Sequence, residues 1–251
     1  MKVLILVQSV DKPDFIRVRE AQQQTWDSVE VPNVQTVYYL PGDVDDILEG
    51  NTLRIRQGLH WQYMFFTFAK ALRHMLKYEW DYVFKTDNST YIDKAKLYEI
   101  LSSKPRTNYY GGMSFPFKIE GVHGVDFFWG DGYALSRDMA QYIVDCYNKA
   151  PFKGMQEDDI VVAKILMDKC PWDNTLQIYL PVMNELKIEP GHHAYRVRID
   201  AVNYSPAAFE FDDIKTIIDN DIFIMNQIHN TVTNGKANNR EGVLEEAQDK
   251  A

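Results

Sequence analysis

The sequence predicts an α/β fold, a single domain in which helices flank a mostly parallel central sheet. Short apolar segments alternate with longer segments of helical period, which is the order found in right-handed βαβ units. The 251 residues are 45% hydrophobic and 25% charged, a balance typical of soluble domains with a sizeable core. Because neither a repeat nor a low-complexity linker divides the chain, we assign residues 1–230 to one domain and residues 231–251 to a polar, flexible tail.

Strands are predicted where short apolar runs are rich in β-branched or aromatic residues. The first of these runs, residues 2–8, is too short to span a membrane or to form the core of a signal peptide. Further strands are expected at residues 34–40, 81–86 and 108–113, and a strand or hairpin at 126–135. After Pro171 the pattern weakens, and only residues 177–182 and 221–225 look like strands.

Helices are predicted between these strands. Residues 61–77 show the clearest pattern, because Phe65, Phe68 and Leu72 recur on one stripe at helical spacing. Acidic residues 43–49 are expected to form a solvated loop or a short helix. The remaining predicted helices cover residues 14–25, 94–101, 137–148 and 158–168.

The charge and cysteine content argue against several classes of function. A net charge of −9 opposes nucleic-acid binding over most of the surface, although it leaves room for a local basic groove. Cys146 and Cys170 are too few for a disulfide framework or a cysteine-type zinc site. No GxGxxG or GxxxxGK(S/T) motif is present, which argues against a dinucleotide-dependent dehydrogenase and a P-loop NTPase. We therefore expect a cytoplasmic protein without a membrane span.

The first candidate site follows the predicted strand at residues 81–86. That strand delivers the oxygens of Asp87 and Ser89 into the loop at its carboxyl end, where ligands bind in open α/β sheets. Two oxygens at positions i and i+2 of a turn can face one Mg²⁺ or Mn²⁺ ion, and such an ion typically bridges a bound diphosphate. Asp, Asn and Ser are also the usual turn formers after any strand, so a structural role stays open.

The second candidate is the acidic segment 156–159, immediately before an apolar helix. One carboxylate of this segment, at the rim of a cleft, can act as a general base that takes the proton from an attacking hydroxyl. Carboxylates at the start of a helix also serve as caps and dipole partners, so the segment alone does not decide between these roles.

Histidines form the third candidate set. His192 and His193 lie close to two arginines in the sequence, and His229 follows the apolar run at residues 222–225. A histidine that converges on an Asp-bound metal would be a ligand, whereas a lone histidine after a strand is usually structural.

Aromatic residues form the fourth set, at positions 115–117 and 127–133. Aromatic faces beside an aspartate and glycines suit stacking against a sugar or a base, although such runs are more often part of the core. Gly130 and Gly132 lie on either side of Asp131, which indicates a close backbone approach at this point.

Together these pieces resemble GT-A-fold glycosyltransferases of the β-1,3-galactosyltransferase, Fringe and core-1 synthase group, family GT31. Four blocks match in the family's order over residues 1 to about 168. The blocks are REAQQQTW at 19–26, DYVFKTDNSTY at 81–91, GDGYALSRD at 130–138 and Glu157-Asp158 with its apolar helix. The second block corresponds to the metal-binding DxD motif of the family. Beyond these blocks only residues 221–229 have a counterpart, a strand that ends in a metal-ligating histidine.

The resemblance implies an inverting transfer of a sugar from a nucleotide-sugar, with a UDP-linked donor and Mn²⁺ or Mg²⁺ expected. It implies a catalytic base at Asp158, beside Glu157. The implied metal ligands are Asp87, Ser89 and His229, with His192 or His193 as the alternative histidine. The donor-binding candidates are Gln8, Arg19, Asp87, Asn88, Trp129 and Asp131. Arg19 either faces the phosphates or pairs with neighbours such as Glu20. The acceptor would be a hydroxyl of a glycan, a lipid, a protein or a modified DNA base.

The chain departs from the family pattern at two positions. Ser89 stands at the third DxD position and offers a neutral oxygen, which is a weaker ligand for a hard cation. Asp131 replaces a glycine of the family. The membrane anchor and disulfides of well-known members have no counterpart here, so we expect a bacterial, phage or viral relative.

Three other functions stay open. The chain could be a non-catalytic GT-A-fold module that binds nucleotide or sugar, or an unrelated nucleotide-binding α/β enzyme. It could also be a phage-type enzyme that acts on modified DNA bases. The feature that favours DNA is a basic cluster of Lys187, His192, His193, Arg196 and Arg198.

Overall fold

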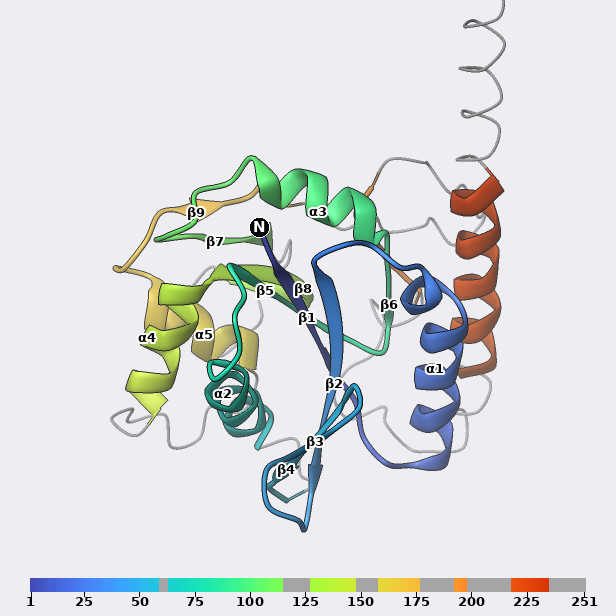
Figure 1. Ribbon diagram of the computed structural model, residues 1–251, viewed down its shortest axis with the longest axis horizontal. Helices are drawn as coiled ribbons and strands as arrows, with labels where there is room; N and C mark the ends of the chain where they lie inside the picture. The colour runs from blue at the N-terminus through green and yellow to red at the C-terminus, as the bar shows by residue number, and fades with distance from the viewer. Residues whose placement is uncertain (59–62, 115–126, 148–157, 177–191, 198–217, 235–251) are drawn as a thin grey trace, which may run out of the picture.

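The fold is built around one large sheet with helices on both faces (Figure 1). The computed structural model describes residues 1–58, 63–114, 127–147, 158–176, 192–197 and 218–234. The strands in these residues are β1 (Val3–Gln8), β2 (Val34–Gly42), β3 (Ile47–Glu49), β4 (Thr52–Arg56), β5 (Tyr82–Asp87), β6 (Thr90–Ile92), β7 (Tyr110–Ser114), β8 (Phe128–Ser136), β9 (Trp172–Asp173) and β10 (Ala194–Arg196).

Eight of these strands form the central sheet in the order β3-β4-β2-β1-β5-β8-β7-β9. Strand β1 pairs in parallel with both β2 and β5, so the carboxyl ends of these three strands meet at one edge. Strand β8 runs antiparallel to β5. Four of the seven pairings are parallel, which confirms the predicted mostly parallel α/β sheet.

The helices divide into two layers (Figure 1). The described helices are α1 (Pro13–Gln24), α2 (Met64–Met75), α3 (Lys94–Ser102), α4 (Arg137–Tyr147), α5 (Asp158–Leu166) and a C-terminal helix at residues 218–234. Helices α1, α3 and the C-terminal helix cover one face of the sheet, and α2, α4 and α5 cover the other. None of the helices in the described ranges is long and apolar enough to cross a membrane.

Strand β1 shows why both layers form. Its side chains alternate between the faces, as the pleat of a strand requires. Val3, Ile5 and Val7 belong to the core beneath α1 and α3, whereas Leu4 and Leu6 belong to the core beneath α2, α4 and α5. A continuous apolar run is therefore needed, because both faces of this central strand are buried.

A second, two-stranded sheet lies beside the end of β5. Strand β10 pairs antiparallel with β6, and its register places Arg196 opposite Thr90. The Val197 N–H extends this pairing with a 2.8 Å hydrogen bond to the Ser89 carbonyl. This pairing brings a segment about one hundred positions later in the chain next to the Asp87–Ser89 turn.

Several predicted elements differ from the observed ones. Residues 221–225, predicted as a strand, lie within the helix at 218–234, and this helix also takes in the first residues of the predicted flexible tail. Residues 47–49, predicted as a loop or short helix, form β3, and β4 beside it was not predicted. The predicted strand at 177–182 lies outside the described residues.

Candidate functional site

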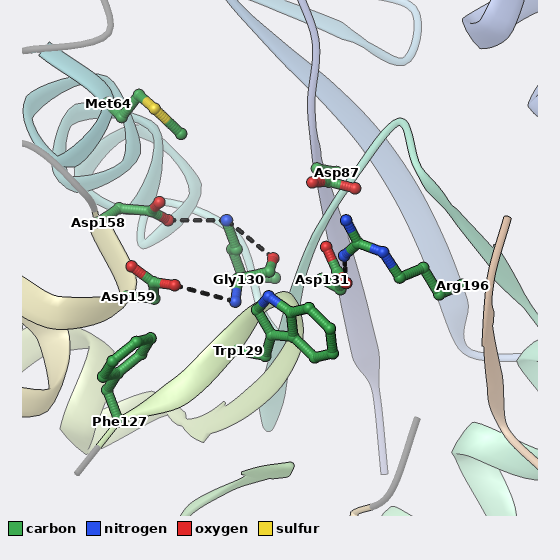
Figure 2. A pocket seen from close by; sticks show the side chains of 10 residues that line it. Met64, Asp87, Phe127, Trp129, Gly130, Asp131, Asp158, Asp159 and Arg196 are labelled. Carbon is green, nitrogen blue, oxygen red and sulfur yellow. Dashed lines mark hydrogen bonds and ion pairs between the residues drawn. The ribbon is translucent and has the colours of Figure 1, made fainter. Parts of the chain in front are cut away.

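A pocket of about 260 Å³ opens where β5, β8 and the start of α5 meet. Its walls carry four carboxylates, two cationic side chains and two aromatic rings (Figure 2). The lining residues are Met64, Lys85, Asp87, Phe127, Trp129, Gly130, Asp131, Asp158, Asp159 and Arg196. Three of the sequence blocks singled out above therefore meet in one pocket.

A buried ion pair forms one wall. Lys85 Nζ lies 2.9 Å from Asp158 Oδ2, and both side chains are only 2% exposed. Burial alone would lower the pKa of Lys85, but the carboxylates of Asp158, Asp87 and Asp159 raise it above its ordinary value. The Tyr133 hydroxyl also donates a hydrogen bond of 3.4 Å to Asp158 Oδ2. Asp158 is thus held as a paired carboxylate.

Gly130 lies between the ion pair and the neighbouring carboxylate. Its carbonyl accepts a 3.0 Å hydrogen bond from Lys85 Nζ, and its N–H donates one of 3.1 Å to Asp159 Oδ2 (Figure 2). A Cβ on Gly130 would stand 3.2 Å from Asp159 Oδ2 and 3.4 Å from Lys85 Nζ. The close backbone approach predicted at Gly130 is therefore present, and a side chain there would press against both charged groups.

Asp87 and Ser89 form a tight turn at the end of β5. Asp87 Oδ1 accepts a 2.7 Å hydrogen bond from the Ser89 N–H and a 2.5 Å hydrogen bond from the Ser89 hydroxyl. Asp87 lines the pocket, whereas Ser89 is 1% exposed and is not among the lining residues. Hydrogen bonds of this kind stabilise a turn after any strand. They also leave Asp87 Oδ2 outside these two bonds, so the turn is a potential cation site as well.

Asp131 lies beside this turn, and both its backbone carbonyl and its carboxylate are held by neighbouring side chains. Its backbone carbonyl accepts hydrogen bonds from the hydroxyls of Thr86, at 2.6 Å, and Thr90, at 3.0 Å. Its Oδ2 forms an ion pair with Arg196, and its Oδ1 lies 3.4 Å from the Ser89 hydroxyl oxygen. The Arg196 guanidinium also stacks over Trp129, 4.7 Å from the ring centroid.

The other donor-binding candidates lie near the end of β1 and do not line this pocket. Gln8 Oε1 accepts a hydrogen bond of 3.2 Å from Tyr39, and Asn88 Nδ2 donates one of 3.1 Å to Ser9. Arg19 pairs with Asp11 at 3.1 Å, so it contacts a carboxylate, although a different one from Glu20. Arg54 forms an ion pair with the same Asp11.

The histidines lie apart from the pocket lining. His229 is in the helix at 218–234, where its Nδ1 is 3.1 Å from the Tyr91 hydroxyl. His193 is 2% exposed and packs edge-on against Phe84, and His192 packs against Tyr195. None of these three histidines is among the residues that line the pocket with Asp87, and the role of a histidine as metal ligand stays a prediction.

Sequence reasoning missed two cations of the site. Lys85 stands alone in an apolar strand, and a lysine in such a strand needs a buried carboxylate partner, a signal that was present in the sequence. Arg196 was counted in a basic cluster, but it is 8% exposed and paired with Asp131. Glu157, Lys187 and Arg198 lie outside the described residues.

Comparisons with known proteins identify the fold. No protein-family model matches the sequence, and no curated protein sequence matches it. The structure of a glycosyltransferase involved in the glycosylation of the major capsid of PBCV-1 is similar, with a TM-score of 0.52 and 11% identity over 89% of this chain and 98% of that chain.

Two further glycosyltransferase structures are more distant. The galactosyltransferase LgtC, in complex with donor and acceptor sugar analogues, has a TM-score of 0.45 and 13% identity over 87% of this chain and 95% of that chain. The mannosyltransferase PcManGT from Pyrobaculum calidifontis, in complex with GDP-Man and Mn²⁺, has a TM-score of 0.44 and 13% identity over 68% of this chain and 54% of that chain. The likeness to the PBCV-1 enzyme confirms the predicted GT-A-like fold.

Proposed function

We propose that this protein is an inverting glycosyltransferase of the GT31-like type, which moves a sugar from a UDP-linked donor to an acceptor hydroxyl. One observation carries the proposal. Asp87, Asp131 and the Asp158-Asp159 pair come from blocks far apart in the sequence, yet they line one pocket in a GT-A-like fold. The pocket lies at the carboxyl end of β5, where open α/β sheets bind their ligands.

The size of the pocket suits one end of the donor. Small-molecule sites usually measure about 300–1,000 Å³, and this pocket measures about 260 Å³. It therefore fits the diphosphate and the sugar better than a whole nucleotide-sugar. Trp129 and Phe127 in its wall offer apolar ring surface of the kind that sugars contact.

The catalytic base belongs to the pair at the start of α5. Asp158, the candidate from the sequence, is 2% exposed and already bonded to Lys85 and Tyr133. Asp159 is less buried, lines the same pocket and is oriented by the Gly130 N–H. The Ile160 N–H also donates a 2.8 Å hydrogen bond to the other oxygen of Asp159. Because a base must be reached by the acceptor hydroxyl, the lesser burial of Asp159 makes it the base in this proposal, with Asp158 as its support.

The oxygen ligands that the pocket offers fit a divalent cation. Its four carboxylates exceed its two cationic side chains, which leaves a formal charge of −2 before an anionic diphosphate enters. Asp87 and the Ser89 hydroxyl are the motif oxygens that would hold Mn²⁺ or Mg²⁺. When bound, such an ion supplies neutralisation of the charge that develops on the leaving diphosphate.

The experiment is calorimetric titration with UDP, with GDP as control, in MnCl₂ and in EDTA. We expect UDP to bind, and UDP-sugars then to be hydrolysed or transferred. Failure of both nucleotides to bind would overturn the proposal. Binding of UDP without turnover of any UDP-sugar would indicate the non-catalytic module instead. The DNA alternative has little support from the described residues, because His193 and Arg196 of the basic cluster are buried.

A further inference from the structure

We propose that Asp131 supplies the second carboxylate of the divalent-cation site, in place of the carboxylate missing at Ser89, and that Arg196 holds its side chain in position. This inference rests on the proposed function, because the cation is the one that accompanies the donor diphosphate. It concerns a position at which the chain departs from the family pattern, where an aspartate replaces glycine.

The two carboxylates converge on one hydroxyl. Asp87 Oδ1 is 2.5 Å from the Ser89 hydroxyl oxygen, and Asp131 Oδ1 is 3.4 Å from the same oxygen. A serine hydroxyl carries a single proton, so it can donate fully to only one of them, and the shorter contact goes to Asp87. The Arg196 guanidinium offsets one of these two negative charges, so one remains for a bound cation to neutralise. In the view of Figure 2 the end of the Arg196 side chain is drawn between the carboxylates of Asp87 and Asp131.

The two oxygens of Asp131 have different surroundings. Oδ2 forms the ion pair with Arg196, whereas Oδ1 faces the Ser89 hydroxyl. This is the arrangement of a ligating carboxylate whose second oxygen is held by an outer partner. Arg196 is itself fixed, because it stacks on Trp129 and lies in the β10–β6 pairing. Arg196 is therefore a positioning residue.

The backbone of Asp131 is anchored as firmly as its side chain. Thr86 and Thr90, both 0% exposed, donate hydrogen bonds to its carbonyl. These threonines flank the Asp87–Ser89 turn on either side in the sequence. The segment that carries Asp87 thus also fixes the backbone of Asp131, and this keeps the two carboxylates at a constant position relative to each other.

Two carboxylates suit a cation that is shared with its ligand. No group of three or more His, Cys, Asp or Glu side chains that could hold a metal occurs in the described part of the chain. Mg²⁺-type ions are usually bound through one or two carboxylates, with substrate phosphates and water completing the shell. We therefore expect the metal and the nucleotide to bind cooperatively, so that each binds weakly in the absence of the other.

The test measures how strongly Mn²⁺ tightens UDP binding. Calorimetry with UDP, in MnCl₂ and in EDTA, is carried out on the wild type, Asp131→Asn and Asp87→Asn. Asp145→Asn, an exposed carboxylate on α4, is the matched control. Because Asp131→Asn leaves Arg196 without its carboxylate, Asp131→Asn/Arg196→Gln is the second variant, and circular dichroism checks that each variant is folded.

We expect Mn²⁺ to tighten UDP binding about 100-fold in the wild type and in Asp145→Asn, and less than about tenfold in the variants that lack Asp87 or Asp131. Affinity in EDTA should stay within about threefold of the wild type, whereas a merely structural role of Asp131 would weaken binding in both buffers. A wild-type Mn²⁺ effect in folded Asp131→Asn, or equal UDP binding by the wild type in both buffers, would overturn this inference and leave the proposed function standing. If neither UDP nor GDP bound the wild type, both would fail.

Discussion

Lys85 and Asp158 form an ion pair of 2.9 Å in which both side chains are shielded from solvent. The pair joins the central strand β5 to the first turn of α5, and it borders the pocket in which the acidic side chains converge. Because a buried charge is costly without its partner, the pair fixes the start of α5 against the sheet. The position of the neighbouring Asp159 depends on this arrangement.

Removal of one partner of this pair should destabilise the fold strongly. Lys85→Met leaves Asp158 buried without its cation, and we expect a loss of about 3–5 kcal/mol in the free energy of unfolding, as for other broken buried pairs. Lys85→Met/Asp158→Asn should recover part of that loss. Urea unfolding of the two single variants and the double variant gives the coupling energy directly.

The matched control for these Lys85 and Asp158 variants is an ion pair on the surface. Lys2 and Glu79 are 2.8 Å apart, but their side chains are 53% and 89% exposed. Lys2→Met should leave the free energy of unfolding almost unchanged, because water solvates and screens an exposed pair. An equally small effect of Lys85→Met would show that the buried pair does not anchor α5.

Asp159→Asn should abolish most of the transfer activity. The amide keeps one oxygen that can accept the 3.1 Å bond from the Gly130 N–H, while the basic group is lost together with the 2.8 Å bond from the Ile160 N–H to the other oxygen. We expect kcat to fall by about 10²–10⁴-fold with little change in the KM for the donor. Hydrolysis or transfer of a UDP-sugar, measured at saturating donor, checks this.

Asp168→Asn, an exposed carboxylate just beyond α5, is the control for Asp159→Asn and should retain wild-type kcat. The competing assignment makes a distinct prediction. If Asp159→Asn kept a near-normal kcat while a folded Asp158→Asn protein lost activity but still bound UDP, the base would be Asp158.

His229→Ala separates a structural histidine from a metal ligand. The contact between its Nδ1 and the Tyr91 hydroxyl joins the helix at 218–234 to β6. Its loss should lower the free energy of unfolding by about 1 kcal/mol and leave the Mn²⁺ dependence of UDP binding unchanged. Urea unfolding and calorimetry measure the two effects. A tenfold or larger loss of the Mn²⁺ effect would support the sequence-based role of His229 as a ligand.

The parts of the fold that could be predicted from sequence are those with strong local patterns. The central strands have runs long enough to be buried on both faces, and β1 and β5 were predicted to within a residue or two. The same patterns place Asp87 at the carboxyl end of β5 and Asp158 at the start of α5. Since carboxyl ends of parallel strands share one edge of a sheet, the site around Asp87 followed from topology.

The parts that could not be predicted depend on contacts between distant segments. Ile222–Met225 is a short apolar run, and periodicity alone cannot distinguish a strand from a buried helix at that length. Strand β10 has only three residues, and its pairing with β6 has no local signal. Arg196, the partner of Asp131, was missed for this reason, because it belongs to that strand.

The stability of the protein should fall as the pH falls from about 6.5 to about 4 because of His193. Its side chain is 2% exposed and packs edge-on against Phe84, with ring centroids 5.9 Å apart. Burial, with a smaller effect of neighbouring His192, lowers its pKa from 6.5 to about 4, although Asp93 opposes the shift. The unfolded chain therefore binds a proton that the folded chain excludes across this pH window.

The sign follows from proton linkage: stability rises with pH wherever the unfolded state binds more protons. Between the two pKa values of His193 the free energy of unfolding should thus decrease on acidification, by at most about 3 kcal/mol. Urea unfolding at about pH 7 and pH 4.5 should show this loss in the wild type and a much smaller loss in His193→Leu, which cannot take up the proton. His192→Gln removes the partly exposed neighbour, and this variant should keep most of the wild-type dependence of the free energy of unfolding on pH. Parallel stability–pH curves for the wild type and His193→Leu would show that acid destabilisation arises elsewhere, because a neutral buried His193 must make the two curves diverge below pH 6.5.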